Sequence, residues 1–252
     1  MQRRSSVAID VEGIILKSFN YGEHHKIVKV LTENQGVIGV FVQNANKVNT
    51  KKSALVQPLT CARFNLKPST NANSDLYYVY SGDVIDYYLN VKLDYENIAY
   101  FYFMIELILK GMAESEYSSY VYRMLKNFLD AAEQGYSAYL LSLIFQLKMM
   151  PIIGIEPVMD CCAVCRSTEH IATLSVRQGG LVCAKCYHPA EPILIDAPLI
   201  PIVRALYKVD INHLPEVELE EELLKPIEQF LDAYYDSYAG LHLQTKKFMK
   251  EI

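Results

Sequence analysis

Short runs of alternating apolar and polar side chains fill the first part of the chain. Five of these runs are rich in β-branched and aromatic residues, which favour strands, and clusters of Asn, Gly, Ser and Pro separate them. They cover residues 7–16, 27–31, 37–42, 59–66 and 76–85. Because no helical period interrupts them, the pattern predicts a small closed β-barrel.

The fourth run shows how the alternation assigns the two faces of the barrel. Successive side chains of a strand point to opposite faces, so Ala62, Phe64 and Leu66 are expected inside the barrel. Arg63 and Lys67 then share its outer face.

After residue 94 the apolar positions change to a helical period. Amphipathic segments cover residues 98–109, 120–132, 138–150, 199–208 and 216–239. We therefore predict an α+β multidomain protein with a barrel domain in residues 1–88 and an α-helical domain in residues 89–252. The most apolar segments are shorter than the roughly 20 residues of a membrane span, and the N-terminus does not resemble a secretory signal. A cytoplasmic protein without a membrane segment is expected.

Charge is distributed unevenly along the chain. Residues 1–67 contain ten Lys and Arg against four Asp and Glu, a balance of +6, which leaves −11 for the remainder of the net −5. This asymmetry predicts that the first domain binds a polyanion, although a charged surface that only contacts water is the plain alternative. The candidate phosphate-binding residues are Lys17, Lys26, Lys29, Lys47, Lys51, Lys52, Arg63 and Lys67.

Two further features of the barrel domain bear on this prediction. Residues 44–57 contain three Lys and three Asn without a strand pattern, and we interpret them as a mobile basic loop. Phe19, Tyr21 and Phe41 are suited either to stacking on bases or to filling the barrel core.

Four cysteines form two C-x-x-C pairs, Cys162 with Cys165 and Cys183 with Cys186, separated by 17 residues. This spacing is typical of a structural site for one Zn²⁺ ion, and it places a zinc-binding insertion at residues 160–187. An iron–sulfur cluster and a thiol redox switch are also built from such pairs. Cys161 is an alternative to Cys162 as a ligand, and Cys61 lies in a predicted strand, where it is expected to be buried.

The sequence contains none of the common catalytic motifs. H-x-E, H-E-x-x-H, the phosphate-binding loop, the G-x-S-x-G elbow and the dinucleotide-binding fingerprint do not occur. A closed site of four cysteines also leaves no open metal position for chemistry. We therefore predict that the protein is not an enzyme.

Several segments resemble the RecO family of bacterial recombination mediators. The matching segments are EGIILK at residues 12–17, YGEHHKIV at 21–28, LTENQG at 31–36, QPL at 57–59, LY at 76–77, GIEP at 154–157 and GGLVC at 179–183. They extend in order over essentially the whole chain, and the barrel opening combined with a zinc knuckle makes the resemblance specific. Two segments depart from the family pattern: residues 43–47 contain neither Gly nor Arg, and Arg166 stands where members often have Gly.

The resemblance implies an N-terminal OB-fold, a helical C-terminal domain and an inserted zinc knuckle. It also implies binding to single- and double-stranded DNA, annealing of complementary strands and nucleoid association. Partners implied by it are RecR and the acidic C-terminal tail of the single-stranded DNA-binding protein, in the loading of RecA. Arg123, Lys126 and Lys148 are the candidate residues for binding that tail. The alternative function is a zinc-ribbon interaction protein whose barrel binds RNA or a protein.

Overall fold

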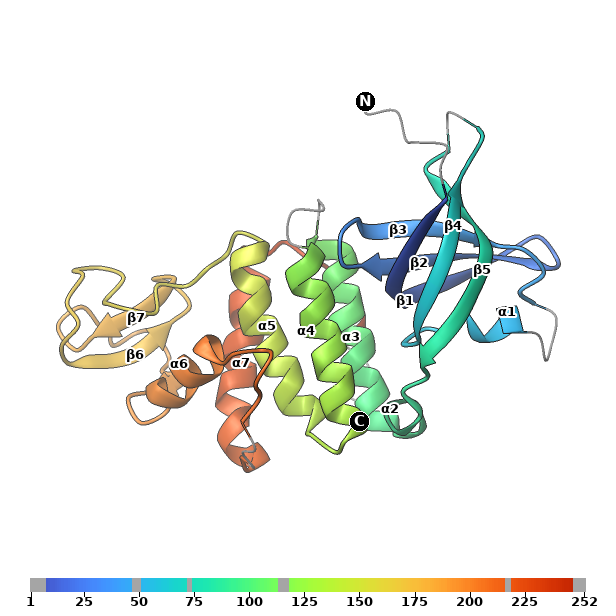
Figure 1. Ribbon diagram of the computed structural model, residues 1–252. Helices are drawn as coiled ribbons and strands as arrows, with labels where there is room; N and C mark the ends of the chain where they lie inside the picture. The colour runs from blue at the N-terminus through green and yellow to red at the C-terminus, as the bar shows by residue number, and fades with distance from the viewer. Residues whose placement is uncertain (1–7, 47–50, 72–73, 113–117, 216–218, 247–252) are drawn as a thin grey trace. The chain divides into compact units, whose positions relative to one another are not determined.

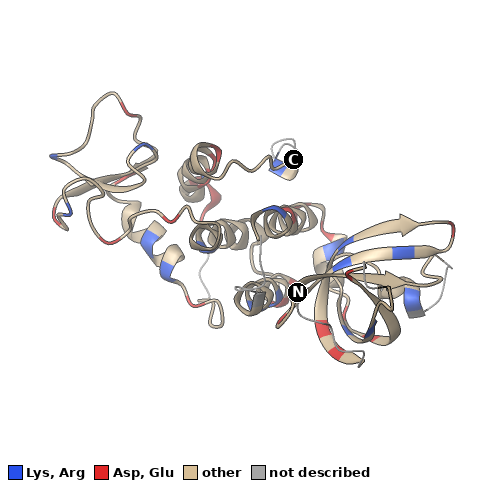
Figure 2. Cartoon of the chain, turned by 90° about the horizontal axis from the view of Figure 1, so that it is seen from above, with Lys and Arg blue, Asp and Glu red and all other residues tan. Residues whose placement is uncertain are grey.

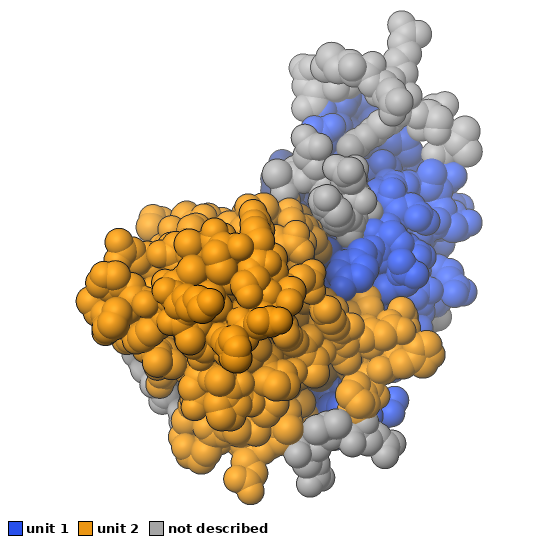
Figure 3. Space-filling model, turned by 90° about the vertical axis from the view of Figure 1, so that its left-hand side faces the viewer, with its two compact units in different colours: residues 1–101, 113–136 blue, residues 102–112, 137–252 orange. Residues whose placement is uncertain are grey.

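The computed structural model describes residues 8–46, 51–71, 74–112, 118–215 and 219–246 (Figure 1). The chain forms two compact units, which Figure 3 shows in different colours. One unit contains residues 1–101 and 113–136, and the other contains residues 102–112 and 137–252. The predicted boundary between domains at residues 88 and 89 stays a prediction.

A closed five-stranded barrel forms the larger part of the first unit. Its strands are β1 (Ile9–Tyr21), β2 (His25–Thr32), β3 (Gly36–Val42), β4 (Cys61–Pro68) and β5 (Leu76–Asp86). Their order around the barrel is β1-β2-β3-β5-β4, and β4 pairs with β1 to close it. All neighbours are antiparallel except β3 and β5, which run parallel. This is the expected OB-fold architecture.

The inner side chains of the barrel follow the predicted alternation. Ala62, Phe64 and Leu66 are completely buried, while Arg63 and Lys67 are exposed on the outer face, which confirms the assignment made from the sequence. The core also contains Val28, Val30, Val40 and Val42 from the neighbouring strands. Burying apolar surface at about 25 cal/mol per Å² is what holds so small a barrel together.

The interpretation of residues 44–57 as a loop without fixed structure is wrong in the part that the structure describes. Helix α1 (Lys51–Ala54) lies within this stretch, and Ala45, Leu55 and Val56 are buried in the barrel core. The physical reason is that these three apolar side chains join the barrel core, which holds the described backbone around them in place.

Two helices accompany the barrel in the first unit. They are α2 (Leu89–Leu93), which the sequence did not predict, and α4 (Ser118–Glu133). The Tyr122 hydroxyl donates a 2.8 Å hydrogen bond to the Glu12 carboxylate of β1, and the Tyr88 hydroxyl donates a 2.7 Å bond to Asp130 of α4. The first of these partly buried, charge-assisted bonds fixes α4 on the barrel, and the second joins the start of α2 to α4.

The second unit combines helices with a small sheet. Its helices are α5 (Ala138–Ile152), α6 (Ile200–Lys208) and α7 (Glu221–Tyr238), while α3 (Tyr95–Gly111) contributes residues to both units. The sheet has the order β7-β6-β8, with β6 (Ile171–Ser175), β7 (Gly180–Cys183) and β8 (Ile195–Asp196). Pro151 lies inside α5, which ends at Ile152, two residues beyond the end expected from the sequence. In the described part of the chain, no helix is both long enough and apolar enough to span a membrane.

Candidate metal centre and nucleic-acid interface

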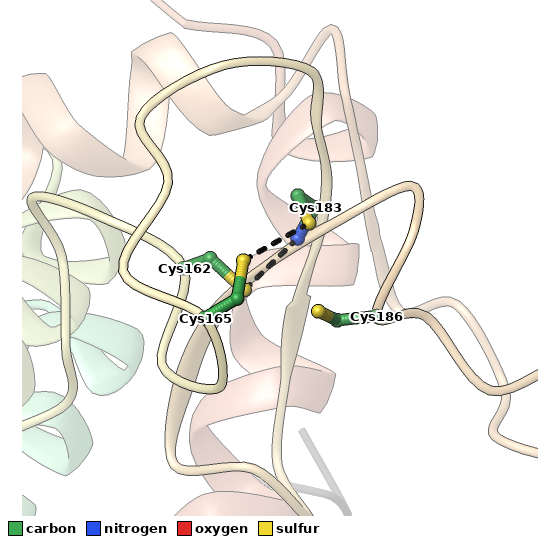
Figure 4. A group of neighbouring side chains, drawn as sticks. All are labelled: Cys162, Cys165, Cys183 and Cys186. Carbon is green, nitrogen blue, oxygen red and sulfur yellow. Dashed lines mark hydrogen bonds between the residues drawn. The ribbon is translucent and has the colours of Figure 1, made fainter.

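The four cysteines of the two C-x-x-C pairs meet at one point in the second unit. Their Sγ atoms all lie within 4.8 Å of one another (Figure 4). Cys162 and Cys165 come from a turn before β6, Cys183 ends β7, and Cys186 follows in the next turn. The four residues selected from the sequence spacing are therefore the same four that the fold places side by side.

Matching turns form the two halves of this cluster. The backbone N–H of Arg166 donates to the Cys162 carbonyl at 2.9 Å, and that of Cys186 donates to the Cys183 carbonyl at 3.0 Å. The N–H of Ala163 also donates to the Leu181 carbonyl at 2.7 Å, which joins the first turn to β7. Two residues between cysteines are what such a turn needs to aim both sulfurs at one point.

Two glycines before Cys183 have different functions. Gly179 has φ +67°, a left-handed conformation that glycine adopts without strain, so it closes the turn between β6 and β7. Gly180 is required for another reason: a Cβ there would lie 2.5 Å from the Val158 carbonyl oxygen. Arg166 has φ +65° although it carries a side chain, so a glycine would adopt this backbone conformation with less strain.

Backbone amides polarise the sulfur atoms of the cluster. Burial by itself raises the pKa of Cys162, but N–H groups of Cys165, Cys183 and Val164 point at the sulfur and lower the pKa to about 6. Similar amide contacts lower the pKa of Cys183. The pKa of Cys186 is raised to about 12, chiefly because its thiol shares hydrogen bonds with Cys165 and Cys183. The backbone amides thus stabilise negative charge on the sulfurs of Cys162 and Cys183.

The spacing of the sulfur atoms fits a tetrahedral metal ion. With metal–sulfur bonds of about 2.3 Å, two ligands of a regular tetrahedron lie about 3.8 Å apart. The Cys165 and Cys183 Sγ atoms are 3.7 Å apart. All four donors are soft sulfurs, the ligand type that Zn²⁺ and iron–sulfur clusters prefer.

The other two cysteines are outside this cluster. Cys161 is not among the residues that converge, so the choice of Cys162 agrees with the geometry. Cys61 is completely buried on β4, as expected, where burial and then the Glu12 carboxylate raise the pKa of its thiol to about 11. It is therefore a protonated, inert thiol.

Two lysines lie opposite each other on the outer face of the barrel. Lys17 of β1 and Lys29 of β2 are cross-strand partners, and both are exposed. Like charges directly opposite destabilise a sheet. Within the described residues neither forms an ion pair that would offset this repulsion. An anion between them would remove the repulsion.

The remaining basic candidates have different surroundings. Arg63 forms a 3.6 Å ion pair with Glu12 and lies opposite Asp83 of β5, so acids flank it on both sides. Lys26 is half-buried and lies two residues before the inward-facing Val28. Because alternate residues of a strand share a face, Lys26 does not share a face with Lys29. Figure 2 shows that charges of both signs occur on the barrel.

Three candidates come from the stretch between β3 and β4. Lys52 lies on helix α1 and is half-buried. Lys51 begins the same helix, and only its backbone is described. Lys47 lies outside the described residues.

A row of aromatic side chains lies beside the lysine pair. The register places Lys67, Tyr78, Phe41, Ile27 and Phe19 next to one another across all five strands. The Phe41 ring is 5.2 Å from that of Tyr78, 5.7 Å from that of Tyr21 and 5.3 Å from that of His25, measured between centroids. Phe19, Tyr21 and Phe41 therefore lie on the outer face, and the alternative that they fill the core is wrong. Sequence reasoning missed Tyr78 and Tyr80, since only the parallel β3–β5 pairing brings β5 to this face.

The three candidate residues for a partner's acidic tail differ in availability. Lys126 pairs with Asp130 at 3.2 Å on the same helix. Lys148 donates to the Tyr207 carbonyl, and burial lowers the pKa of its ammonium group. Arg123 is exposed, and among the described residues its side chain donates to the backbone of its own helix at Ser119 alone.

Comparisons with known proteins cover nearly the whole chain. A family described as "Recombination protein O N terminal" matches residues 7–88, and one described as "Recombination protein O C terminal" matches residues 92–247. The chain is 32% identical to the DNA repair protein RecO of Bacillus pumilus over 248 residues, which cover 97% of this chain and 94% of that protein. It is 31% identical to the DNA repair protein RecO of Bacillus subtilis over 245 residues, 96% and 93% of the two chains. For that of Listeria monocytogenes serotype 4b the identity is 28% over 242 residues, again 96% and 93%.

Proposed function

Because the chain belongs to the RecO family of DNA repair and recombination proteins, we propose that it is a recombination mediator. It binds single- and double-stranded DNA, promotes annealing of complementary strands and assists RecA loading together with RecR. In this function it performs no covalent chemistry. Its work is to hold two strands, or a strand and a protein, close together.

The Lys17–Lys29 pair is the observation that best supports DNA binding by the barrel. Two exposed ammonium groups face the same side of adjacent strands, without a carboxylate among the described residues to neutralise them. Phosphates that bind there release counterions from the DNA, which provides most of the affinity of sequence-independent binding. Lys67 of β4 adds a third positive charge at the far end of the row of side chains that crosses the five strands from Phe19.

Annealing follows from the same electrostatics. Two complementary strands repel each other through their phosphates, and a basic surface that binds both lowers this repulsion. It also raises the local concentration of each strand near the other. Since phosphate contacts carry no sequence information, the protein is expected to anneal any complementary pair.

The test is fluorescence-anisotropy binding to a labelled single strand and to a duplex of equal length across a series of salt concentrations. Each phosphate contact contributes about −0.7 to the slope of log K against log salt for a single strand and about −0.9 for a duplex. The double variant Lys17→Gln, Lys29→Gln is expected to weaken binding to both DNAs and to make the slope shallower by about 1.4 for the single strand and about 1.8 for the duplex.

Arg63→Gln is the matched control, because it removes one charge from the same barrel at a place where Glu12 and Asp83 already offset it. It should change affinity much less than either lysine. If the unmodified protein binds neither DNA at low salt, the proposed function is wrong. An RNA competitor of equal length that displaces the DNA at lower concentration would favour RNA as the natural ligand.

We also propose that the four-cysteine centre binds one structural Zn²⁺ ion. Cys162, Cys165, Cys183 and Cys186 provide the complete ligand set, so the ion would be closed to substrate. Its contribution is to cross-link the two turns that hold the small sheet, where few apolar contacts are available.

The proposed protein partners are RecR and the acidic C-terminal tail of the single-stranded DNA-binding protein. The tail carries negative charge, so it requires a basic contact, and Arg123 is the most available of the three candidate side chains. Anisotropy of a labelled tail peptide with the full chain and with Arg123→Gln tests this contact. Equal affinity for both proteins would exclude Arg123.

A further inference from the structure

Six aromatic side chains gather on one part of the outer barrel surface, and we call them the aromatic row. Its members are Phe19, Tyr21, His25, Phe41, Tyr78 and Tyr80. They come from four strands, β1, β2, β3 and β5, so only the closed barrel brings them together. The strands lie about 4.8 Å apart, so the row together with Lys67 on β4 follows a path of about 19 Å along the curved surface of the barrel.

The barrel core does not need these rings. Its interior is filled by Val28, Val40, Phe64 and their neighbours, all completely buried. Four rings of the row remain in water instead, with exposed fractions of 44% for Phe19, 55% for Tyr21, 44% for Tyr78 and 69% for Tyr80. A contiguous exposed apolar patch of this kind marks a binding surface more often than a structural one.

Lysine ammonium groups accompany the rings at both ends of the row. The Lys17 Nζ atom is 5.2 Å from the centroid of Phe19, and the Lys67 Nζ atom is 4.3 Å from the centroid of Tyr80. A ligand that suits this surface has flat apolar faces and regularly spaced negative charges. Single-stranded nucleic acid has both, and OB-folds bind such strands over about 4–16 nucleotides.

We propose that the aromatic row is a base-stacking platform that gives the barrel a preference for unpaired strands over duplex DNA. This inference rests on the proposed function, in which the barrel binds DNA through its lysines. In a duplex each base face is covered by the next base pair, so only an unpaired strand can offer faces to the rings. The lysines then bind either form of DNA, while the rings distinguish between them.

Alanine variants of the two most exposed rings, Tyr21→Ala and Tyr80→Ala, provide the first test. Each should weaken binding to a single-stranded 20-nucleotide thymidine oligomer by about 5- to 150-fold, the equivalent of 1–3 kcal/mol per stacked base. Duplex affinity should change by less than about twofold. Tyr95→Ala is the matched control, since Tyr95 is also largely exposed but begins α3 instead of lying on the barrel. Thermal melting of each variant separates lost binding from lost folding.

An oligomer of equal length with abasic sites provides the second test. It keeps the phosphates and removes the base faces, so the unmodified protein should bind it at least as weakly as Tyr80→Ala binds the intact oligomer. The double lysine variant should lose affinity for both oligomers by the same factor.

A fluorescent reporter provides the third test, because the chain contains no tryptophan. Tyr80→Trp should show quenched emission when the intact single strand binds and little change with the abasic oligomer, whereas Tyr95→Trp should respond to neither. Equal loss of single-strand and duplex binding in the alanine variants, or no loss of either, would overturn the stacking proposal while leaving DNA binding intact. Absence of all binding by the unmodified protein would instead overturn the proposed function.

Discussion

The cysteine centre and the outer face of the barrel gather functional side chains in opposite ways. At the cysteine centre all four sulfurs come from two short turns, and they point inward at one another within 4.8 Å. On the barrel, the aromatic row and the lysines come from all five strands and point outward to solvent. At the cysteine centre the chain itself provides four converging sulfur ligands, whereas on the barrel the side chains face away from the chain.

Because of this difference, substitutions at the cysteine centre are expected to change stability, and substitutions on the outer face of the barrel are expected to change binding. Removing one cysteine leaves three donors that hold a metal poorly, so the local fold should fail with it. Removing one exposed lysine or ring from the barrel leaves the core untouched, so only the affinity for a ligand should change. Substitutions in the two regions can therefore test whether this division holds.

The largest effect is expected at a metal ligand. Cys183→Ser should abolish stoichiometric zinc and unfold residues 160–187, because apparent zinc-binding free energies of about 10–16 kcal/mol in small zinc domains are also folding free energies. Metal content by mass spectrometry and thermal melting would measure both. The barrel should keep its affinity for DNA in this variant.

Cys161→Ser is the control for this substitution. Cys161 is next to a proposed ligand in sequence but does not join the cluster. The zinc content and melting temperature of the Cys161→Ser variant should therefore match those of the unmodified protein. Zinc loss on substitution of Cys161, with retention in Cys183→Ser, would show that the ligand set is assigned wrongly.

A smaller effect is expected where a glycine makes space for backbone. Gly180→Ala places a Cβ 2.5 Å from the Val158 carbonyl oxygen, and neither backbone can move without breaking the pairing at the start of β7. A cost of about 1–3 kcal/mol in the free energy of unfolding is expected from denaturant titration. On the barrel, Gly39→Ala meets only the end of the flexible Leu76 side chain and should cost clearly less. Equal losses in the free energy of unfolding for the two variants would contradict the difference expected between the cysteine centre and the barrel.

The smallest effect is expected at a strained residue beside the cysteines. Arg166 has φ +65°, so Arg166→Gly should raise the free energy of unfolding by about 0.5–1 kcal/mol. Arg166→Ala removes the same guanidinium group but keeps the strain, and it should give no such gain. A gain of equal size in both variants would mean that the charge and not the backbone is responsible.

The sequence predicted the cysteine centre well because its chemistry is local. Two C-x-x-C pairs and the two glycines before Cys183 are visible without any knowledge of the fold. The function of Gly180 was not predictable, because the Val158 carbonyl that it accommodates lies outside the motif.

On the barrel, the strands and the direction of Ala62, Phe64 and Leu66 followed from alternation alone. The partners of each outer side chain did not, because they depend on register between strands that are distant in sequence. Arg63 appeared to be one cation among several until the β1–β4 pairing placed it beside Glu12. In the same way, the parallel β3–β5 pairing brings Tyr78 to Phe41.

The pairing of β1 with β4 also has a consequence for the order in which the chain folds. It joins Ile9 to Leu66, whereas the two cysteine pairs are separated by only 17 residues. Loop-closure entropy grows with the logarithm of the distance along the chain, so closing the barrel costs about 1 kcal/mol more than closing the cysteine loop, before any contact repays it. Non-local strand pairings of this kind are slow to form. The surface that we assign to DNA therefore belongs to a late stage of folding, and a nascent chain has no aromatic row until all five of its strands are available.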